Sequence, residues 1–212
     1  MREALLIWAA LLIFAVSHSM LASHRAKALA QRLLGQRAAQ AVYRLIFNAI
    51  ALVAIAPALG LVAALPDREL YRLPFPLDVI ALIVQFGALL ALAYSLWQMD
   101  WAFFLGLRQL SAPPPGTSID STSTARLVTD GLHRYVRHPL YTAALVLLAL
   151  VSPMTRNRLA LIAGVALYFS LGSILEERQL VREFGEAYRA YQRRVPRLWP
   201  RLWPRPVRRR AP

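Results

Sequence analysis

A histidine-proline pair ahead of an apolar block is one of two places where this sequence could do chemistry. Residues 131–141 read GLHRYVRHPLY, and Pro139 suits the first turn of a helix, where its missing N–H costs nothing. A helix start presents free N–H groups, and beside Arg137 and His138 these groups could bind an anion. The same residues could instead form a basic belt with interfacial tyrosines at a membrane surface. The pattern alone leaves both interpretations open.

The second place is a pair of glutamates, Glu176 and Glu177, directly after another apolar block. Two carboxylates at a membrane boundary are costly unless they are paired or used. We expect one helix to continue through Tyr191, and a spacing of four puts Glu176 on its apolar face, with Leu180, Phe184 and Tyr188. The spacing predicts that Glu176 points inward, as a site residue or as the ion-pair partner of Arg134 or Arg137. Glu177, rotated by about 100°, is expected to pair with Arg178 or another arginine.

Apolar blocks must position these residues, and they predict an all-α, polytopic membrane bundle of about five transmembrane helices. A membrane helix needs roughly 20 apolar residues. The fourth block is short, so it either begins before Pro139 or forms a hairpin with the fifth through residues 152–155. The first block lacks a small-residue cleavage site and is read as a retained span. The blocks are Ala4–Ala22, Val42–Leu65, Leu77–Gln98, Pro139–Val151 and Leu159–Leu175.

Composition excludes most soluble classes of protein. The chain has 212 residues, a net charge of +14, 58% apolar residues and 17% charged residues, whereas soluble domains are about a quarter charged. Twenty of the 25 basic residues fall on one side of a five-span arrangement, which predicts an outside amino terminus and a cytoplasmic carboxyl terminus in a cell membrane. The excess charge is assigned to topology and to lipid contact, notably at residues 208–210, and not to nucleic acid.

Several kinds of site are excluded or left open. The chain has no cysteine, so disulfides and thiolate chemistry are absent, and no two of its four histidines have metal-ligand spacing. No metal is therefore expected. Residues 112–125 are rich in Pro, Ser and Thr and form either a plain linker or a mobile cover over a site.

Residues 131–141 and 176–200 resemble the isoprenylcysteine carboxyl methyltransferase superfamily. The shared pattern is R-H-P-x-Y, a helical hairpin, then E-E-x-x-L with F-G-x-x-Y-x-x-Y and V-P, and it covers roughly residues 99–200. Within the superfamily, residues 104–109, 153–155 and 174–178 are most similar to the bacterial methanethiol S-methyltransferase group. The His18-Ser19 pair occurs both in that group and in NnrU-like membrane proteins.

The resemblance implies an integral membrane enzyme that uses S-adenosyl-L-methionine. An arginine that binds the substrate carboxylate in the related enzymes corresponds to Gly172, which favours a small uncharged or thiol substrate. His133 stands where the family has a tyrosine. No catalytic base is assigned, although His133 and His138 are the nearest candidates. The residues expected to bind the cofactor, from the resemblance or as polar and aromatic neighbours, are Leu127, Val128, His133, Tyr135, Arg137, His138, Pro139, Tyr141 and Glu176.

Three functions remain open from the sequence: a small-thiol S-methyltransferase, a methyltransferase for an isoprenoid, lipid amine or other acceptor, and a non-enzymatic NnrU-like protein. We expect one membrane domain over residues 1–212, with three amino-terminal spans (1–98), a methyltransferase region (99–200) and a basic tail (201–212). The expected partners are a small-molecule substrate and membrane lipids. The sequence leaves the oligomeric state open.

Overall fold

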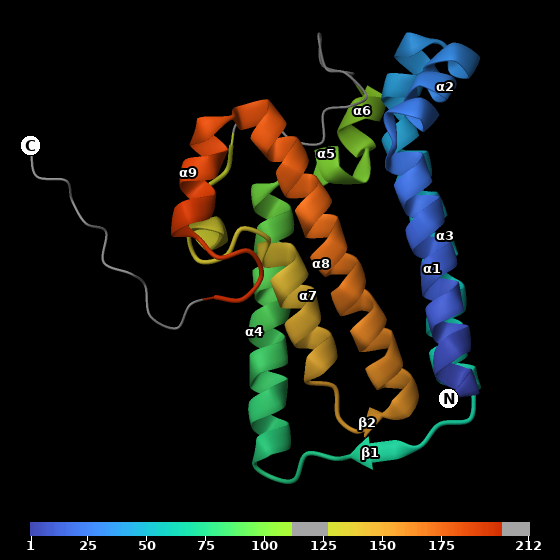
Figure 1. Ribbon diagram of the computed structural model, residues 1–212, viewed down its shortest axis with the longest axis vertical. Helices are drawn as coiled ribbons and strands as arrows, with labels where there is room; N and C mark the ends of the chain where they lie inside the picture. The colour runs from blue at the N-terminus through green and yellow to red at the C-terminus, as the bar shows by residue number, and fades with distance from the viewer. Residues whose placement is uncertain (112–126, 201–212) are drawn as a thin grey trace, which may run out of the picture.

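The structure, a computed structural model, describes residues 1–111 and 127–200 (Figure 1). The expected loop 112–125 and the basic tail 201–212 lie outside the described residues. In chain order the elements are α1 (Arg2–Ala22), α2 (His24–Leu34), α3 (Gln36–Ala64), β1 (Glu69–Tyr71), α4 (Leu77–Gln98), α5 (Trp101–Leu105), α6 (Leu107–Ser111), η1 (Gly131–Arg134), α7 (Pro139–Ala149), β2 (Met154–Thr155), α8 (Arg156–Phe184) and α9 (Glu186–Arg194).

Within the described residues, four helices, α1, α3, α4 and α8, are long and apolar enough to cross a membrane, and they correspond to the first, second, third and fifth predicted blocks. The fourth block forms α7, which has 11 residues. At 1.5 Å per residue α7 is about 16 Å long, roughly half the thickness of a bilayer core. α7 begins at Pro139 and not before it, so the short block forms a hairpin with α8 through residues 150–155.

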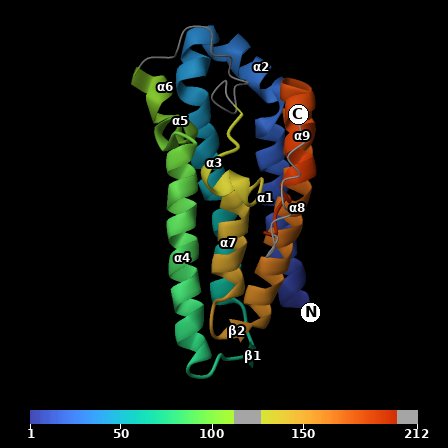
Figure 2. The ribbon, with the colours of Figure 1, turned by 90° about the vertical axis from the view of Figure 1, so that its left-hand side faces the viewer.

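The helices form an all-α membrane bundle in which α8 joins two groups (Figures 1 and 2). α1 packs against α3, α4 packs along α7, and α8 contacts α1 on one side and α7 on the other. The indole N–H of Trp8 donates to the carbonyl of Ala160 (2.8 Å), which joins α1 to α8. The buried core at this contact consists of Ile7, Leu11, Ala58, Ala160 and Leu161. Many large apolar side chains stay exposed on the outer faces, which suits lipid contact.

A short antiparallel pairing of β1 with β2 ties the two groups together at the end where the amino terminus lies (Figure 1). Asn157, 2% exposed, lies in the first turn of α8 there. Its backbone N–H donates to Asp67 Oδ1 (3.1 Å), and its side-chain amide donates to the carbonyls of Leu65 (3.3 Å) and Pro66 (3.4 Å). The connection after α3 is therefore fixed to the start of α8.

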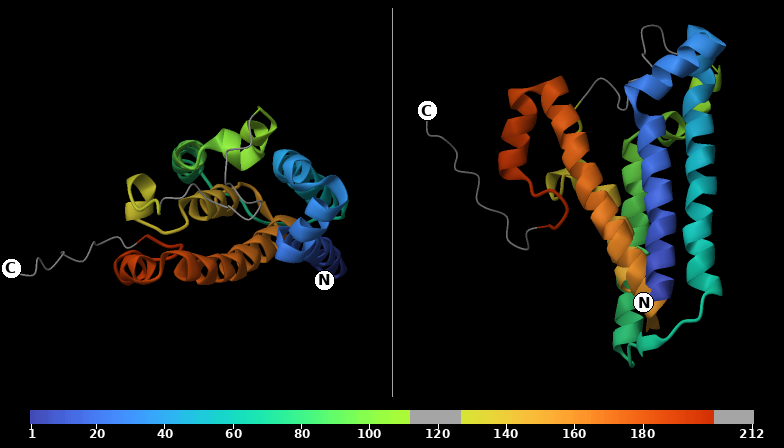
Figure 3. Two further views of the ribbon diagram at one scale, coloured as in Figure 1. Left: turned by 90° about the horizontal axis from the view of Figure 1, so that it is seen from above. Right: turned by 45° about the vertical axis from the view of Figure 1, so that its right-hand side comes forward.

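The expected single helix from the fifth block through Tyr191 is wrong, because the chain breaks at Gly185. Gly185 has φ 55° and ψ −129°, a backbone conformation that L side chains rarely adopt. α8 ends at Phe184, and α9 folds back beside it (Figures 1 and 3). This return places α9 and the segment after it against the start of α7.

Candidate functional site

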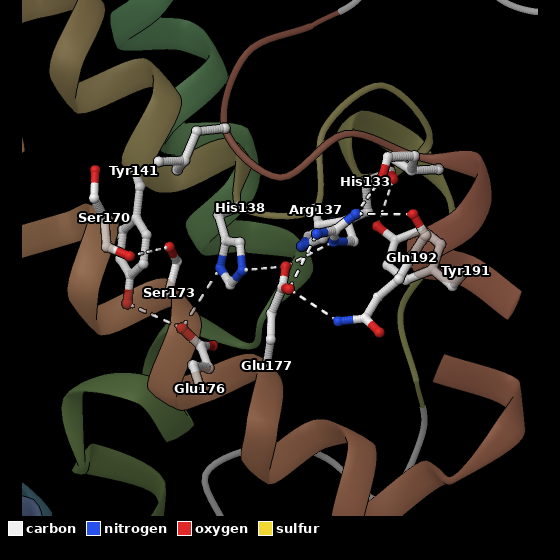
Figure 4. Close-up of polar contacts among 12 residues, drawn as sticks. His133, Arg137, His138, Tyr141, Ser170, Ser173, Glu176, Glu177, Tyr191 and Gln192 are labelled. Carbon is white, nitrogen blue, oxygen red and sulfur yellow. Dashed lines mark hydrogen bonds and ion pairs between the residues drawn. The ribbon is translucent and has the colours of Figure 1, made fainter. Parts of the chain in front are cut away.

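The centre of the site is a buried carboxylate, Glu177, held by three side chains, two from the segment directly before α7 and one from α9 (Figure 4). Arg137 Nε lies 2.6 Å from Oε1 and its terminal nitrogen 3.0 Å from Oε2, so the pair is bidentate. His138 Nε2 lies 3.2 Å from Oε1, and the amide of Gln192 on α9 donates to Oε2 at 2.9 Å. The Arg137 and Glu177 side chains are each 10% exposed. Because the charges are buried and paired, this cluster fixes α7, α8 and α9 relative to one another.

Arg137 also binds the chain end that crosses over it. Its second terminal nitrogen donates to the carbonyls of Gln192 (3.1 Å) and Val195. With the two bonds to Glu177, four of its five N–H groups have partners within the described residues. Arg137 therefore positions neighbouring elements, and it is poorly placed to bind a further anion.

Residues 195–198 form a strap across the start of α7. The backbone N–H of Arg137 donates to the carbonyl of Pro196 (2.9 Å), and that of His138 donates to the carbonyl of Arg197 (3.1 Å). The hydroxyl of Thr142 donates to the carbonyl of Leu198, whose side chain is buried. The strap orders the turn before Pro139, which has no backbone N–H of its own.

The prediction that Glu176 points inward is wrong, since Glu176 is the more exposed glutamate. Its side chain is 45% exposed, against 10% for Glu177. Its Oε2 accepts a hydrogen bond from the hydroxyl of Tyr141 (3.1 Å) and lies 3.5 Å from His138 Nδ1. The face was misassigned because Tyr188 belongs to α9 and not to a continuation of α8. The expected alternative, an ion pair between Glu176 and Arg137, is taken by Glu177.

Three aromatic rings stack beside Glu176. The His138 and Tyr141 rings are nearly parallel, 2° apart, with centroids separated by 5.3 Å. Tyr141 also stacks on Phe169 of α8, with ring centroids 4.6 Å apart and ring planes at 11° to each other. Both nitrogens of His138 face carboxylate oxygens, which makes His138 a poor base for a substrate proton. The stack instead gives the half-exposed carboxylate of Glu176 a flat apolar wall.

His133 lies next to this cluster and carries an unsatisfied atom. The hydroxyl of Tyr191 donates to its backbone carbonyl, while its Nδ1 is buried without a hydrogen-bond partner in the described chain. Burial lowers the pKa of His133, and the nearby His138 lowers it further, against the opposing effect of Asp130. His133 is thus neutral near pH 7, and a ligand could satisfy its free nitrogen.

The other predicted site residues differ in their burial and in whether they reach the carboxylates of Glu176 and Glu177. Leu127 and Val128 are half-buried in the coil before η1, and Pro139 is buried at the first position of α7, as predicted. Tyr135 is 59% exposed and packs under the guanidinium of Arg134, 5.6 Å from its ring centroid, so neither reaches the carboxylates. Gly172 lies one turn before Glu176 on α8, and a Cβ built there meets nothing within 4 Å.

The expected pairing of Glu177 with an arginine is met by Arg137, but sequence reasoning missed the burial of Glu177 and the roles of Gln192 and Tyr191. The signal was present in the Phe184-Gly185 pair, because glycine after an apolar residue is a common helix end. A helix ending there allows the next helix to fold back, so that Gln192 and Tyr191 reach the segment before α7.

Together these features define a membrane-embedded helical bundle with a polar site where α7, α8 and α9 meet. The chain belongs to the DUF1295 family, described as a protein of unknown function, which residues 6–195 match. This membership is consistent with the methyltransferase superfamily that residues 131–141 and 176–200 resemble.

Several curated relatives share a name. The chain is 28% identical to methanethiol S-methyltransferase 1 of Bradyrhizobium diazoefficiens over 190 residues. This alignment covers 88% of this chain and 63% of the relative. It is 36% identical over 112 residues to methanethiol S-methyltransferase 2 of the same organism, an alignment that covers 53% of this chain and 42% of the relative. Methanethiol S-methyltransferase of Crocosphaera subtropica is 28% identical over 210 residues, an alignment that covers 92% of this chain and 74% of the relative. The chain thus spans less than two thirds of the first two relatives. No solved structure matches it significantly.

Proposed function

We propose that this protein is an integral membrane methyltransferase that uses S-adenosyl-L-methionine to methylate a small thiol such as methanethiol. One observation carries the proposal. The two halves of the sequence pattern, residues 137–141 and Glu176-Glu177, lie about 35–40 residues apart in the chain but meet through direct polar contacts. Their meeting creates a half-exposed carboxylate beside aromatic rings, and the relatives named methanethiol S-methyltransferase support this choice of reaction.

The residues present suit such a cofactor. Its amino acid part carries an ammonium group, for which the half-exposed carboxylate of Glu176 is a partner. His133 Nδ1 is a buried atom that lacks a partner within the described residues, so it can accept or donate one further hydrogen bond. The flat face of Tyr141 suits a positively charged sulfur or an adenine ring. When bound, the cofactor supplies a methyl group already activated by the positive charge on sulfur.

The chain's own residues then have distinct tasks in this proposal. Tyr141 and His138 orient the Glu176 carboxylate by hydrogen bonding and stacking. Arg137 and Glu177 hold the start of α7 in place, so that the N–H groups of its first turn stay fixed for a carboxylate. Leu127, Val128 and Pro139 provide apolar surface nearby. Orientation and exclusion of water are the main contributions that a protein makes to a methyl transfer of this kind.

In this proposal the acceptor binds at Gly172, where the related enzymes have an arginine. A carboxylate acceptor in this apolar environment would lack a charged partner, and leaving it unpaired would cost several kcal/mol, roughly 3–5. A small uncharged thiol avoids that cost. The open space at Gly172 therefore favours a methanethiol-like acceptor over a prenylcysteine, and we expect Gly172→Arg to block the reaction by filling the space.

The test is a direct assay of purified protein with methyl-labelled cofactor and a panel of acceptors. Formation of dimethyl sulfide from methanethiol would support the proposed acceptor. Methylation of a prenylcysteine analogue or a lipid amine instead would retain the methyltransferase and replace the substrate. Absence of cofactor binding by calorimetry would favour a non-enzymatic, NnrU-like role.

The proposed location is a cell membrane with the amino terminus outside. The helices α2, α6 and α9 all lie toward the end of the bundle opposite the amino terminus, which agrees with the side richest in basic residues (Figures 1 and 2). A reporter fused after Pro212 should report cytoplasm, and a periplasmic signal there would reverse the proposed orientation.

A further inference from the structure

A second polar pair, formed by His18 of α1 and Tyr168 of α8, lies outside the carboxylate cluster. The Tyr168 hydroxyl and His18 Nδ1 are 2.9 Å apart. The His18 ring is packed among aromatic rings, with Phe47 at 4.7 Å and Phe14 at 5.4 Å between centroids. His18 Nε2 has no hydrogen-bond partner within residues 1–111 and 127–200. An imidazole held through one nitrogen, with the other nitrogen free, has the arrangement of a positioned base.

The open space at Gly172 lies between this pair and Glu176. On α8, Gly172 is one turn after Tyr168 and one turn before Glu176, so about 6 Å of helix rise separates it from each. Successive residues turn by about 100°, which places Gly172 between Tyr168 and Glu176 around the helix as well. α1 contacts α8 first near Ala160, then at Gly164, and finally at Tyr168 through His18. The contacts with α1 thus follow α8 up to the turn where the space begins.

Aromatic rings connect the two polar sites. Tyr168 lies against Phe169, with centroids 6.0 Å apart, and Phe169 stacks on Tyr141, which binds Glu176. The pair and the carboxylate cluster therefore share one continuous wall along α8. A small acceptor bound at Gly172 would contact this wall. It would lie between Glu176, one turn further along α8, and the His18–Tyr168 pair, one turn earlier.

We propose that His18 is the catalytic base of this protein, that Tyr168 positions it, and that both face a small-thiol site above Gly172. This inference rests on the proposed function. In the tautomer where His18 Nδ1–H donates to the Tyr168 oxygen, Nε2 has a free lone pair. The thiol S–H bond breaks as Nε2 takes the proton, and the electron pair stays on sulfur. That sulfur forms the new bond to the methyl carbon, whose old bond to the donor sulfur breaks, and the bonding pair returns to the donor, which becomes neutral.

The location of His18 allows the proton to leave. His18 is one turn from the end of α1 at Ala22, near the end of the bundle where α2 begins. Tyr168 is the titratable group in contact with it from α8, while Phe14 of α1 and Phe47 of α3 are uncharged. In this proposal the proton leaves His18 toward the nearby end of the bundle, where α1 ends at Ala22.

The first test compares two acceptors that differ in their need for a base. Methanethiol is almost fully protonated near pH 7, whereas about half of dissolved hydrogen sulfide is already ionised and needs no base. We expect His18→Gln to lower kcat/KM for methanethiol by about 100-fold, a typical contribution of a general base, and to affect hydrogen sulfide much less. Tyr168→Phe should show the same selectivity with a smaller loss. His24→Gln, at an exposed histidine of α2, is the matched control and should behave as the unmodified chain.

The outcomes separate the base from the proposed function. No dimethyl sulfide from the unmodified chain overturns both. If the unmodified chain is active and His18→Gln is equally active with methanethiol, only the base is overturned. An equal loss with both acceptors, or loss of cofactor binding by calorimetry in His18→Gln, would indicate a structural role and also overturn it.

A second test locates the acceptor without measuring turnover. Because the chain has no cysteine, Gly172→Cys provides a single thiol, and methyl methanethiosulfonate would attach a methylthio group there. We expect Gly172→Cys to be labelled faster than Gly87→Cys, a control at a glycine of α4 that also has open surroundings. Dimethyl sulfide, the product, should slow labelling at Gly172 alone. Equal labelling at both positions, or no effect of dimethyl sulfide, would place the acceptor elsewhere.

Discussion

The two ends of the bundle join the same helix groups with polar contacts, but they differ in what they leave unused. At the β1–β2 end, Asn157 is buried and its backbone and side-chain N–H groups all reach acceptors in the connection after α3. At the opposite end, Glu177 is equally satisfied, whereas Glu176 and His133 keep unused capacity. A polar junction that only holds helices together satisfies its groups, while one that binds a ligand leaves some of them available. The following variants test this difference, from the largest expected effect on stability to the smallest.

Glu177→Gln should be the most destabilising. Arg137 would keep its buried charge without a carboxylate, and breaking a buried pair costs about 3–5 kcal/mol. Thermal unfolding in detergent without cofactor measures the loss. A Glu177→Gln protein as stable as the unmodified chain would show that the cluster does not hold α7, α8 and α9 together.

Asn157→Ala should destabilise less and leave the site intact. It removes the two side-chain hydrogen bonds to Leu65 and Pro66 and leaves their carbonyls unpaired, at a cost of about 1–3 kcal/mol. Cofactor affinity, measured by calorimetry below the unfolding temperature, should not change. A reduced affinity would mean that the two ends are coupled.

Glu176→Gln should show the reverse pattern. Its half-exposed side chain contributes little to stability, at most about 1 kcal/mol. If Glu176 holds the cofactor's ammonium, affinity should fall by roughly tenfold or more, since a charge-assisted hydrogen bond contributes about 1.5–3 kcal/mol. Glu183→Gln, on the exposed surface of α8, is the matched control. Unchanged affinity in Glu176→Gln would remove it from the binding site.

The smallest effect expected is a pH dependence from His133. Because burial lowers its pKa, the unfolded chain takes up a proton on His133 more readily than the folded chain. Stability should therefore decrease as the pH falls from the unfolded value of 6.5 toward the lower folded value. Thermal unfolding of His133→Gln should show a weaker decrease over this range. An identical pH profile would indicate that His133 is solvated.

The sequence predicted the larger features of this molecule because they depend on local pattern. Hydropathy located the four long helices, and the fixed φ of proline located the start of α7 at Pro139. A contact between Arg137 and the glutamate pair was expected from helix spacing as one alternative, with Glu176 as the partner, whereas the structure pairs Arg137 with Glu177. The burial of Glu177 could not be read from the spacing on one helix, because it depends on Gln192 returning from α9 and on the strap at residues 195–198.

The strap at residues 195–198 also determines the order in which the contacts of Arg137 can form while the chain is being made. Arg137 precedes its acceptors at Gln192 and Val195 by 55 and 58 residues, and a ribosome makes the chain from the amino terminus. α7 and α8 are therefore made while Arg137 still lacks its partners on α9 and the strap. During that interval the guanidinium can pair with Glu177 as soon as that part of α8 is made. The site of this protein is therefore completed only after α9 and the strap have been made, which places their docking onto Arg137 late in folding.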